Sequence, residues 1–200
     1  MAEQKALGGK TVIVTGAGRG IGRAIALSAA RAGASVVLAS RTEEQLQEVV
    51  REVAALGGAA AAEPCDVRRA ADVERLVARA VAETGRVDAV VSNAGVFVWK
   101  PFEKLTEEEW DTVLDTNLKA TYLLVRTALP ELKKSRGRIV NVASIHGTAG
   151  DANVAAHCAA KFGLVGLTKA LALELRPAGI AVNAVCPGST ENRSRNLEPV

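Results

Sequence analysis

The stretch Thr11-Val12-Ile13-Val14-Thr15-Gly16-Ala17-Gly18-Arg19-Gly20-Ile21-Gly22 decides the fold. Its first residues are all β-branched, which is typical of a buried strand. Four glycines follow, and a helical pattern begins at Ile21. Glycine permits a tight turn and lets backbone N–H groups approach a pyrophosphate at the start of a helix. The stretch therefore predicts a strand, a phosphate-binding turn and a helix in succession.

The spacing of these glycines separates several kinds of nucleotide site. Gly16, Gly20 and Gly22 give G-x-x-x-G-x-G, which differs from the G-x-G-x-x-G fingerprint. A P-loop is excluded because no Lys-Ser/Thr pair follows the last glycine. A turn that only allows close helix packing would also explain glycines. Their place after the first strand of an alternating chain favours nucleotide binding.

Outward from this stretch, short apolar runs alternate with longer helical patterns. We expect strands at 11–14, 35–38, 60–63, 87–91, 138–142 and 180–185. We expect helices over 21–32, 43–56, 70–83, 107–134 and 154–175, with a break in the fourth near Asn117. This alternation predicts the α/β class, as a Rossmann-type doubly wound parallel sheet of six strands. Ligands of such sheets bind beyond the carboxyl ends of the strands.

Composition indicates a single domain over residues 1–200, with 48% hydrophobic and 24% charged residues. No apolar run reaches the ~20 residues of a membrane span, and the first residues lack the apolar core of a secretory signal. The 3 cysteines are widely spaced and the 2 histidines lack a C-x-x-C partner motif, so we expect a reduced, cytoplasmic protein without a metal site. A net charge of +3 spread over mixed segments gives no reason to expect nucleic acid.

The end of the second expected strand bears on the choice of cofactor. A carboxylate that holds the ribose hydroxyls often follows about 20 residues after the glycine turn. Here the strand ends in Ala39-Ser40-Arg41, and no acid occurs before Glu43. Arg41 together with Arg19 would suit a 2′-phosphate, although either alone is an ordinary surface arginine. The pair favours NADP over NAD.

With these features in place, the sequence resembles the short-chain dehydrogenase/reductase family over essentially its whole length. Five segments, in order, carry the resemblance: Thr15 to Gly22, Cys65-Asp66-Val67, Asn93-Ala94-Gly95, Asn117 with Ser144 and Lys161, and Pro187-Gly188. Within the family, the sequence is similar to β-ketoacyl-carrier-protein reductases and to sugar or alcohol dehydrogenases. The resemblance implies a hydride transfer between nicotinamide and a small carbonyl or alcohol substrate.

The resemblance also implies a cofactor site. Asp66 and Val67 would flank the adenine, Asn93 to Gly95 would support the sheet beneath the cofactor, and Pro187-Gly188 would lie near the nicotinamide. The residues expected to bind the cofactor are Gly16, Arg19, Gly20, Ile21, Gly22, Arg41, Asp66, Val67, Asn93, Ala94, Gly95, Lys161, Pro187 and Gly188. The segment after them, Ser189-Thr190-Glu191-Asn192, would set substrate specificity and departs from the family's pattern.

The catalytic motif of the family is changed in this chain. The family uses Asn, Ser, Tyr and Lys, of which Asn117, Ser144 and Lys161 match. The tyrosine position is His157, and the only tyrosine, Tyr122, is expected on another helix. In this family Ser would hydrogen-bond the substrate oxygen, Lys would bind the nicotinamide ribose, and Asn would support a water-linked proton route.

His157 leaves three interpretations open. Four residues separate it from Lys161, so both lie on one helical face. Imidazolium is a competent acid, with an ordinary pKa of about 6.5, but the Lys161 charge and burial both disfavour it. His157 is then a working acid/base, a defect in an otherwise intact site, or an engineered substitution. We expect reduced turnover; the alternative is a catalytically impaired nucleotide-binding protein with a regulatory or structural role.

Two neighbouring features receive plainer interpretations. His146 lies two residues after Ser144, where it could touch substrate, although we expect a solvated loop residue. We expect Cys158 to be inert packing. A hydrolase triad of Ser144, His157 and Asp151 lacks the G-x-S-x-G elbow that would expose the serine.

The helices at 118–134 and 154–175 are apolar nearly all round, so packing on the sheet explains only one face of each. We therefore expect a homodimer or homotetramer through these helices. Family members are usually longer by a seventh strand and flanking helices, so we also expect the chain to be C-terminally truncated.

Overall fold

A computed structural model of the protein describes residues 5–188. Within them, strands pair in the order β3-β2-β1-β4-β5-β6, and every neighbouring pair is parallel. The strands are β1 Thr11–Thr15, β2 Ser35–Ser40, β3 Ala59–Pro64, β4 Ala89–Ser92, β5 Arg138–Val142 and β6 Ala181–Val185. This sheet confirms the Rossmann-type α/β fold that the sequence predicts.

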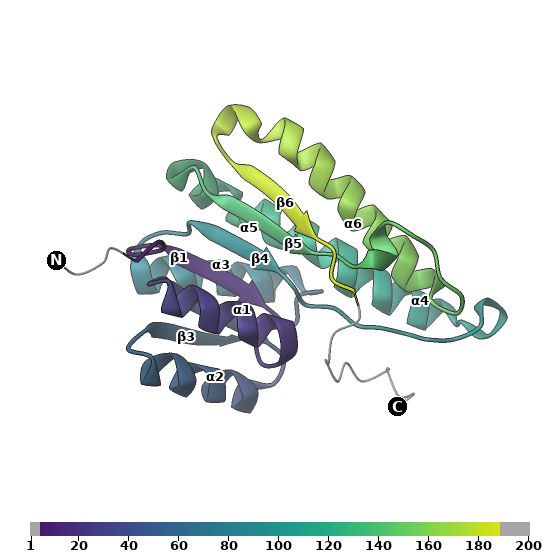
Figure 1. Cartoon of the computed structure of the whole chain (residues 1–200), viewed down its shortest axis with the longest axis horizontal. Helices are drawn as coiled ribbons and strands as arrows, with labels where there is room; N and C mark the ends of the chain where they lie inside the picture. The colour runs from purple at the N-terminus through teal and green to yellow at the C-terminus, as the bar shows by residue number, and fades with distance from the viewer. Residues whose placement is uncertain (1–4, 189–200) are drawn as a thin grey trace.

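Helices cover both faces of the sheet (Figure 1). The helices are α1 Gly20–Arg31, α2 Glu43–Ala55, α3 Ala70–Thr84, α4 Glu107–Leu114, α5 Ala120–Ser135 and α6 Ala155–Glu174. One apolar core lies between the sheet and α1 and α2, and a second lies between the sheet and α3, α5 and α6. The expected boundaries agree with the observed ones to within a few residues. None of the described helices is both long and apolar enough to cross a bilayer.

The expected helix over 107–134 is divided as the sequence indicated near Asn117. A π-helical turn, Asp115–Lys119, joins α4 to α5 without interrupting the helical path. π-turns often occur at functional sites because they displace a side chain from the α-helical register. Here the displaced residue is Asn117, which is buried with 1% of its surface exposed.

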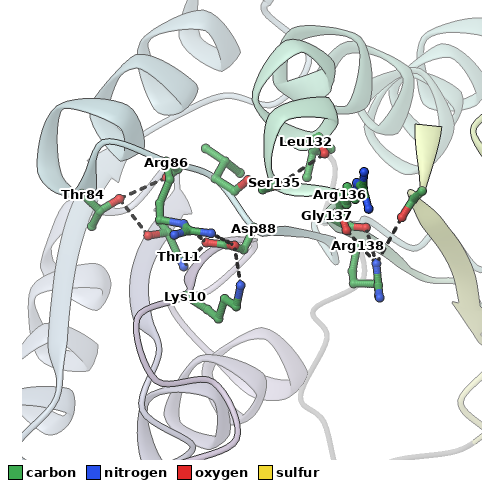
Figure 2. A network of polar contacts seen from close by, with 12 residues as sticks. Lys10, Thr11, Thr84, Arg86, Asp88, Leu132, Ser135, Arg136, Gly137 and Arg138 are labelled. Carbon is green, nitrogen blue, oxygen red and sulfur yellow. Dashed lines mark hydrogen bonds and ion pairs between the residues drawn. The ribbon is translucent and has the colours of Figure 1, made fainter.

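A polar network joins the amino-terminal ends of β1 and β4 (Figure 2). It lies at the end of these strands opposite the glycine turn. Asp88 accepts two hydrogen bonds from the Arg86 guanidinium, at 2.6 and 2.7 Å, and one from the Thr11 amide at 3.0 Å. Lys10 adds an ion pair at 3.2 Å. These bonds tie the start of β1 to the start of β4, the pair of strands that carries the site at their other ends.

Candidate functional site

The glycine turn lies between β1 and α1, at the point where the strand order reverses. A side chain at Gly22 would place its Cβ 2.2 Å from the Gly16 carbonyl oxygen, so only glycine fits there. Gly16 and Gly20 have φ of 64° and 55°, a conformation that glycine adopts at little cost. Asn93, after β4, braces the turn by donating from Nδ2 to the Thr15 carbonyl at 2.9 Å.

The beginning of α1 suits an anionic group. The N-cap residue, Arg19, makes no capping hydrogen bond with its side chain, and the first turn contains no acidic residue. The first N–H groups of a helix lack partners within the helix and carry a partial positive charge. Together with the glycine cradle, they fit the pyrophosphate of a dinucleotide. Ile21 belongs to this first turn.

The carboxyl ends of β2 and β3 place Arg41 and Asp66 near each other. Asp66 accepts a hydrogen bond from Arg68 at 2.6 Å. That bond lowers the pKa of Asp66, and the nearby charge of Arg41 lowers it further. Val67 beside it is buried. This end of the site is therefore an ionised carboxylate beside two guanidinium groups.

Asn117 is fixed by the backbone that follows β4. Its Oδ1 accepts a hydrogen bond from the Val96 amide, and its Nδ2 donates to the Val96 carbonyl, both at 2.8 Å. These two bonds set the orientation of the amide. Gly95 allows this close approach, because a Cβ there would lie 3.1 Å from Asn117 Oδ1. The segment that contains Ala94 and Gly95 thus connects the glycine turn to the π-helical turn.

Ser144 follows β5 and begins a short 3₁₀ turn, Ile145–Gly147. Its Oγ accepts a hydrogen bond from the His146 amide at 3.2 Å. The turn packs closely on α6, because a Cβ at Gly147 would lie 2.8 Å from the Lys161 carbonyl oxygen. The Ile145 amide donates to the Pro187 carbonyl at 3.0 Å, which holds the end of β6, with Gly188 after it, beside this turn.

Lys161 lies on α6 with only 5% of its surface exposed. Its Nζ donates to the Val142 carbonyl at 2.8 Å. Burial lowers the pKa of Lys161 to about 8, and a thiolate at Cys186 would raise it. The lysine is therefore held rigidly at the carboxyl end of β5, and it keeps its charge at neutral pH.

His157 lies one turn before Lys161 on α6, as the spacing predicts. Its Nδ1 lies 3.3 Å from Asn117 Nδ2, and its ring meets the edge of Phe97 with centroids 5.0 Å apart. Because the amide nitrogen can only donate, this contact is a hydrogen bond in the ring tautomer that carries its proton on Nε2. The structure thus brings Asn117, His157 and Lys161 together beside Ser144.

Burial lowers the pKa of His157 to about 4, with further lowering by the charges of Lys161 and His146; a hydrogen bond to the Val96 carbonyl opposes the shift. At pH 7 the imidazole at this position is therefore neutral. The expectation that Lys161 and burial suppress the charged ring is confirmed. His157 is therefore a poor proton source at neutral pH.

The expectation for His146 is wrong, because it is not a solvated loop residue. Its side chain is 20% exposed, and its ring lies 5.6 Å from that of His157, centroid to centroid. Its Nε2 lies 3.5 Å from Asp151 Oδ2. The sequence holds no signal for this contact, since it depends on how the segment after β5 folds against α6.

Other expectations have mixed outcomes. Tyr122 lies on α5, half exposed, and its hydroxyl accepts a hydrogen bond from Arg126 at 2.9 Å, so it does not replace the missing tyrosine. Cys158 is half-buried and not fully packed. The segment 189–192, to which we assign substrate specificity, lies outside the described residues.

Comparison with known proteins places this arrangement in a family. The family model described as short chain dehydrogenase matches residues 10–198. A D-beta-hydroxybutyrate dehydrogenase of Rhizobium meliloti (strain 1021) is 38% identical over 182 residues, which cover 90% of this chain and 70% of that protein. A 3-oxoacyl-(acyl-carrier-protein) reductase of Staphylococcus aureus (strain MW2) is 39% identical over 181 residues, covering 90% and 74%.

Solved structures agree with the sequence relatives. A dehydrogenase/reductase from Sinorhizobium meliloti 1021 superposes with a TM-score of 0.92 at 36% identity, covering 98% of this chain and 78% of that one. A metagenomic short-chain oxidoreductase in complex with NADP gives a TM-score of 0.87 at 40% identity, covering 92% and 84%. The chain belongs to the short-chain dehydrogenase family of oxidoreductases.

Proposed function

We propose that this protein is an NADP-preferring oxidoreductase that transfers hydride between nicotinamide and a carbonyl or alcohol substrate. The observation that supports it most is the convergence of Asn117, Ser144 and buried Lys161 at the carboxyl ends of β4 and β5, next to the glycine turn. The substitution at His157 makes the turnover low.

Each side chain has a distinct task in this proposal. Ser144 donates its hydroxyl proton in a hydrogen bond to the substrate oxygen, since its Oγ already accepts from the His146 amide. Lys161 supplies a fixed positive charge to the nicotinamide ribose hydroxyls. Asn117 holds the Val96 backbone in place and links the site to solvent through water. When bound, the reduced nicotinamide supplies the hydride.

The preference for NADP rests on Arg41 and Arg19. Arg41 follows β2, where an acidic residue would repel a 2′-phosphate, and its charge lies close enough to Asp66 to lower that pKa. A planar guanidinium binds phosphate well. The solved relative in complex with NADP is consistent with this choice.

The test measures binding and turnover separately. Fluorescence titration gives Kd for NADPH and NADH, and we expect at least about tenfold tighter binding of NADPH, a preference that Arg41→Asp abolishes. Turnover is then measured with 3-oxoacyl thioesters and 3-hydroxybutyrate, the substrate types named in the two relatives. NADPH oxidation that is lost in Ser144→Ala supports the enzyme; equal binding of both cofactors would refute the preference.

One observation favours a second candidate, a nucleotide-binding protein without turnover. His157 is neutral at pH 7 and is engaged with Asn117, so the usual proton donor is absent. Tight NADPH binding without turnover on any carbonyl substrate in a broad panel would support this candidate and overturn the enzyme.

A further inference from the structure

A second histidine, His146, lies beside His157, which occupies the family's tyrosine position. The rings of His146 and His157 meet edge to face at 84°, and His146 Nε2 faces the Asp151 carboxylate at 3.5 Å. We propose that His146, positioned by Asp151, is the catalytic acid of this protein and protonates the substrate oxygen that Ser144 binds. This inference rests on the proposed oxidoreductase function.

The first support is the common origin of His146 and Ser144 in one short turn. The His146 amide donates to Ser144 Oγ, so the backbone of one residue orients the hydroxyl of the other. Gly147 lets the same turn press against α6. We place the substrate oxygen that accepts from Ser144 on the side of the turn where the His146 ring meets His157. Both donors are held on a rigid segment.

The second support is the contrast between the two histidines. His157 is half-buried, accepts from Asn117 and stays neutral near Lys161. The His146 side chain keeps 20% exposure, through which it regains a proton from water after each turnover. A carboxylate beside an imidazole helps to orient the ring. The Asp151 carboxylate, 3.5 Å from His146 Nε2 and largely exposed, can do this for His146.

The charged and titratable groups around His146 come from two segments. The loop before α6 contributes Asp151, whose carboxylate lies 3.5 Å from His146 Nε2. Helix α6 contributes His157, whose lowered pKa leaves it neutral at pH 7, and the buried Lys161, whose carbonyl lies against the turn at Gly147. Of these charged groups, the Asp151 carboxylate is the one in direct contact with the His146 ring.

The proposed step balances as a carbonyl reduction. Hydride from the reduced nicotinamide forms a C–H bond at the carbonyl carbon, and the π pair of the C=O bond moves to oxygen. That oxygen takes the proton of the His146 imidazolium and becomes the alcohol hydroxyl. The nicotinamide is oxidised, the substrate is reduced, and neutral His146 is recharged by water. In the oxidation direction, neutral His146 accepts the hydroxyl proton.

A double-mutant cycle separates this role from a structural one. In the natural chain, His146→Gln should lower kcat by about 10²-fold, the usual loss for an acid/base group. In a His157→Tyr background the phenol supplies the proton, so the same substitution should cost less than about threefold. Equal losses in both backgrounds, or no loss in the natural chain, would overturn the proposal.

The pH profile adds a second readout. Carbonyl reduction consumes a proton, which His146 supplies in this proposal, so reduction by the natural chain should fall as pH rises while alcohol oxidation rises, and His146→Gln should remove both trends. Retention of the trends in His146→Gln overturns this inference alone. Absence of turnover in the natural chain at every pH overturns the oxidoreductase function and this inference with it.

The ion pair is tested without cofactor or substrate. Nitrogen-15 NMR at a fixed pH gives the chemical shifts of the His146 ring nitrogens in the protein alone. Asp151→Asn removes the carboxylate that lies 3.5 Å from Nε2, so it should shift the Nε2 resonance. The matched control Asp111→Asn, on the exposed face of α4, should leave that resonance unchanged. An unchanged resonance in Asp151→Asn would overturn the pairing on which the proposal depends.

Discussion

Asn117 Nδ2 lies 3.3 Å from His157 Nδ1, so the residue in the tyrosine position is bound to the π-helical turn. Burial also suppresses the charge on the ring. The anchoring residues of the site are therefore in place, while the group that would move a proton at position 157 is not. Four predictions follow from specific contacts.

Restoring the phenol should restore the rate. His157→Tyr places a hydroxyl one helical turn before Lys161, and we expect NADPH turnover to rise by at least about tenfold. His157→Phe is the matched control, because it fills similar space without an acid and should not raise the rate. Steady-state kinetics with one carbonyl substrate measures both. Equal rates for His157→Tyr and the natural chain would show that the missing phenol is not the limiting defect.

A side chain in the glycine turn should weaken cofactor binding. In Gly22→Ala the new Cβ would lie 2.2 Å from the Gly16 carbonyl oxygen, a backbone atom that cannot rotate away. We expect at least about tenfold weaker NADPH binding and a loss of about 1–3 kcal/mol in the free energy of unfolding. Gly150→Ala, where a Cβ meets nothing within 4 Å, is the control and should change neither quantity.

Asp88 should make stability depend on acid pH. Burial alone would raise its pKa, but hydrogen bonds from Arg86, the Thr11 amide and Lys10 outweigh burial and hold the pKa below 3.8. Because the folded-state pKa is lowered, the stabilisation is present above about pH 4 and is lost as pH falls through the folded value.

Asp88→Asn should therefore cost about 1–3 kcal/mol in the free energy of unfolding at pH 7, and progressively less below pH 4. Urea unfolding at several pH values measures this difference. Glu83→Gln is the control, since its pair with Arg79 is an exposed i,i+4 contact worth at most about 0.5 kcal/mol. A cost for Asp88→Asn that is independent of pH would contradict the electrostatic explanation.

The exposed apolar side chains of α5 and α6 should join two copies of the chain. Tyr122, Phe162 and Leu173 are 48%, 46% and 74% exposed on these helices. We expect sedimentation at micromolar concentration to show at least a dimer, and Phe162→Glu to give a monomer with unchanged circular dichroism. Phe102→Glu, which changes an exposed residue before α4, should keep the natural mass. A monomeric natural chain would refute the prediction.

The sequence predicts the sheet well because its central strands β1, β2 and β4 are short, mostly apolar or β-branched runs that the fold buries. It also places His157 and Lys161 correctly, since a spacing of four residues fixes a shared helical face. The π-helical turn is less predictable, because its residues continue the helical pattern and the bonds between Asn117 and the Val96 backbone form only in the folded structure. The sequence signals a break but not its geometry.

His146 shows why the loops are harder to predict. Its neighbours in sequence are those of an exposed turn, and nothing in their pattern indicates the buried side of α6. The contact arises because Gly147 lets the turn approach the Lys161 carbonyl closely, a tertiary effect that local composition does not encode. The Asp151 pair depends in turn on that approach.

The π-helical turn makes the site sensitive to chain length in a way that substitutions do not reveal. An α-helix has about 3.6 residues per turn, and a π-turn accommodates one residue more. Deleting one residue between Asp115 and Lys119 would therefore let α4 and α5 run on as a single regular helix, with the outer side chains of both helices close to their present directions. The Asn117 amide that now bonds to Val96 would leave the site although no functional side chain had been replaced.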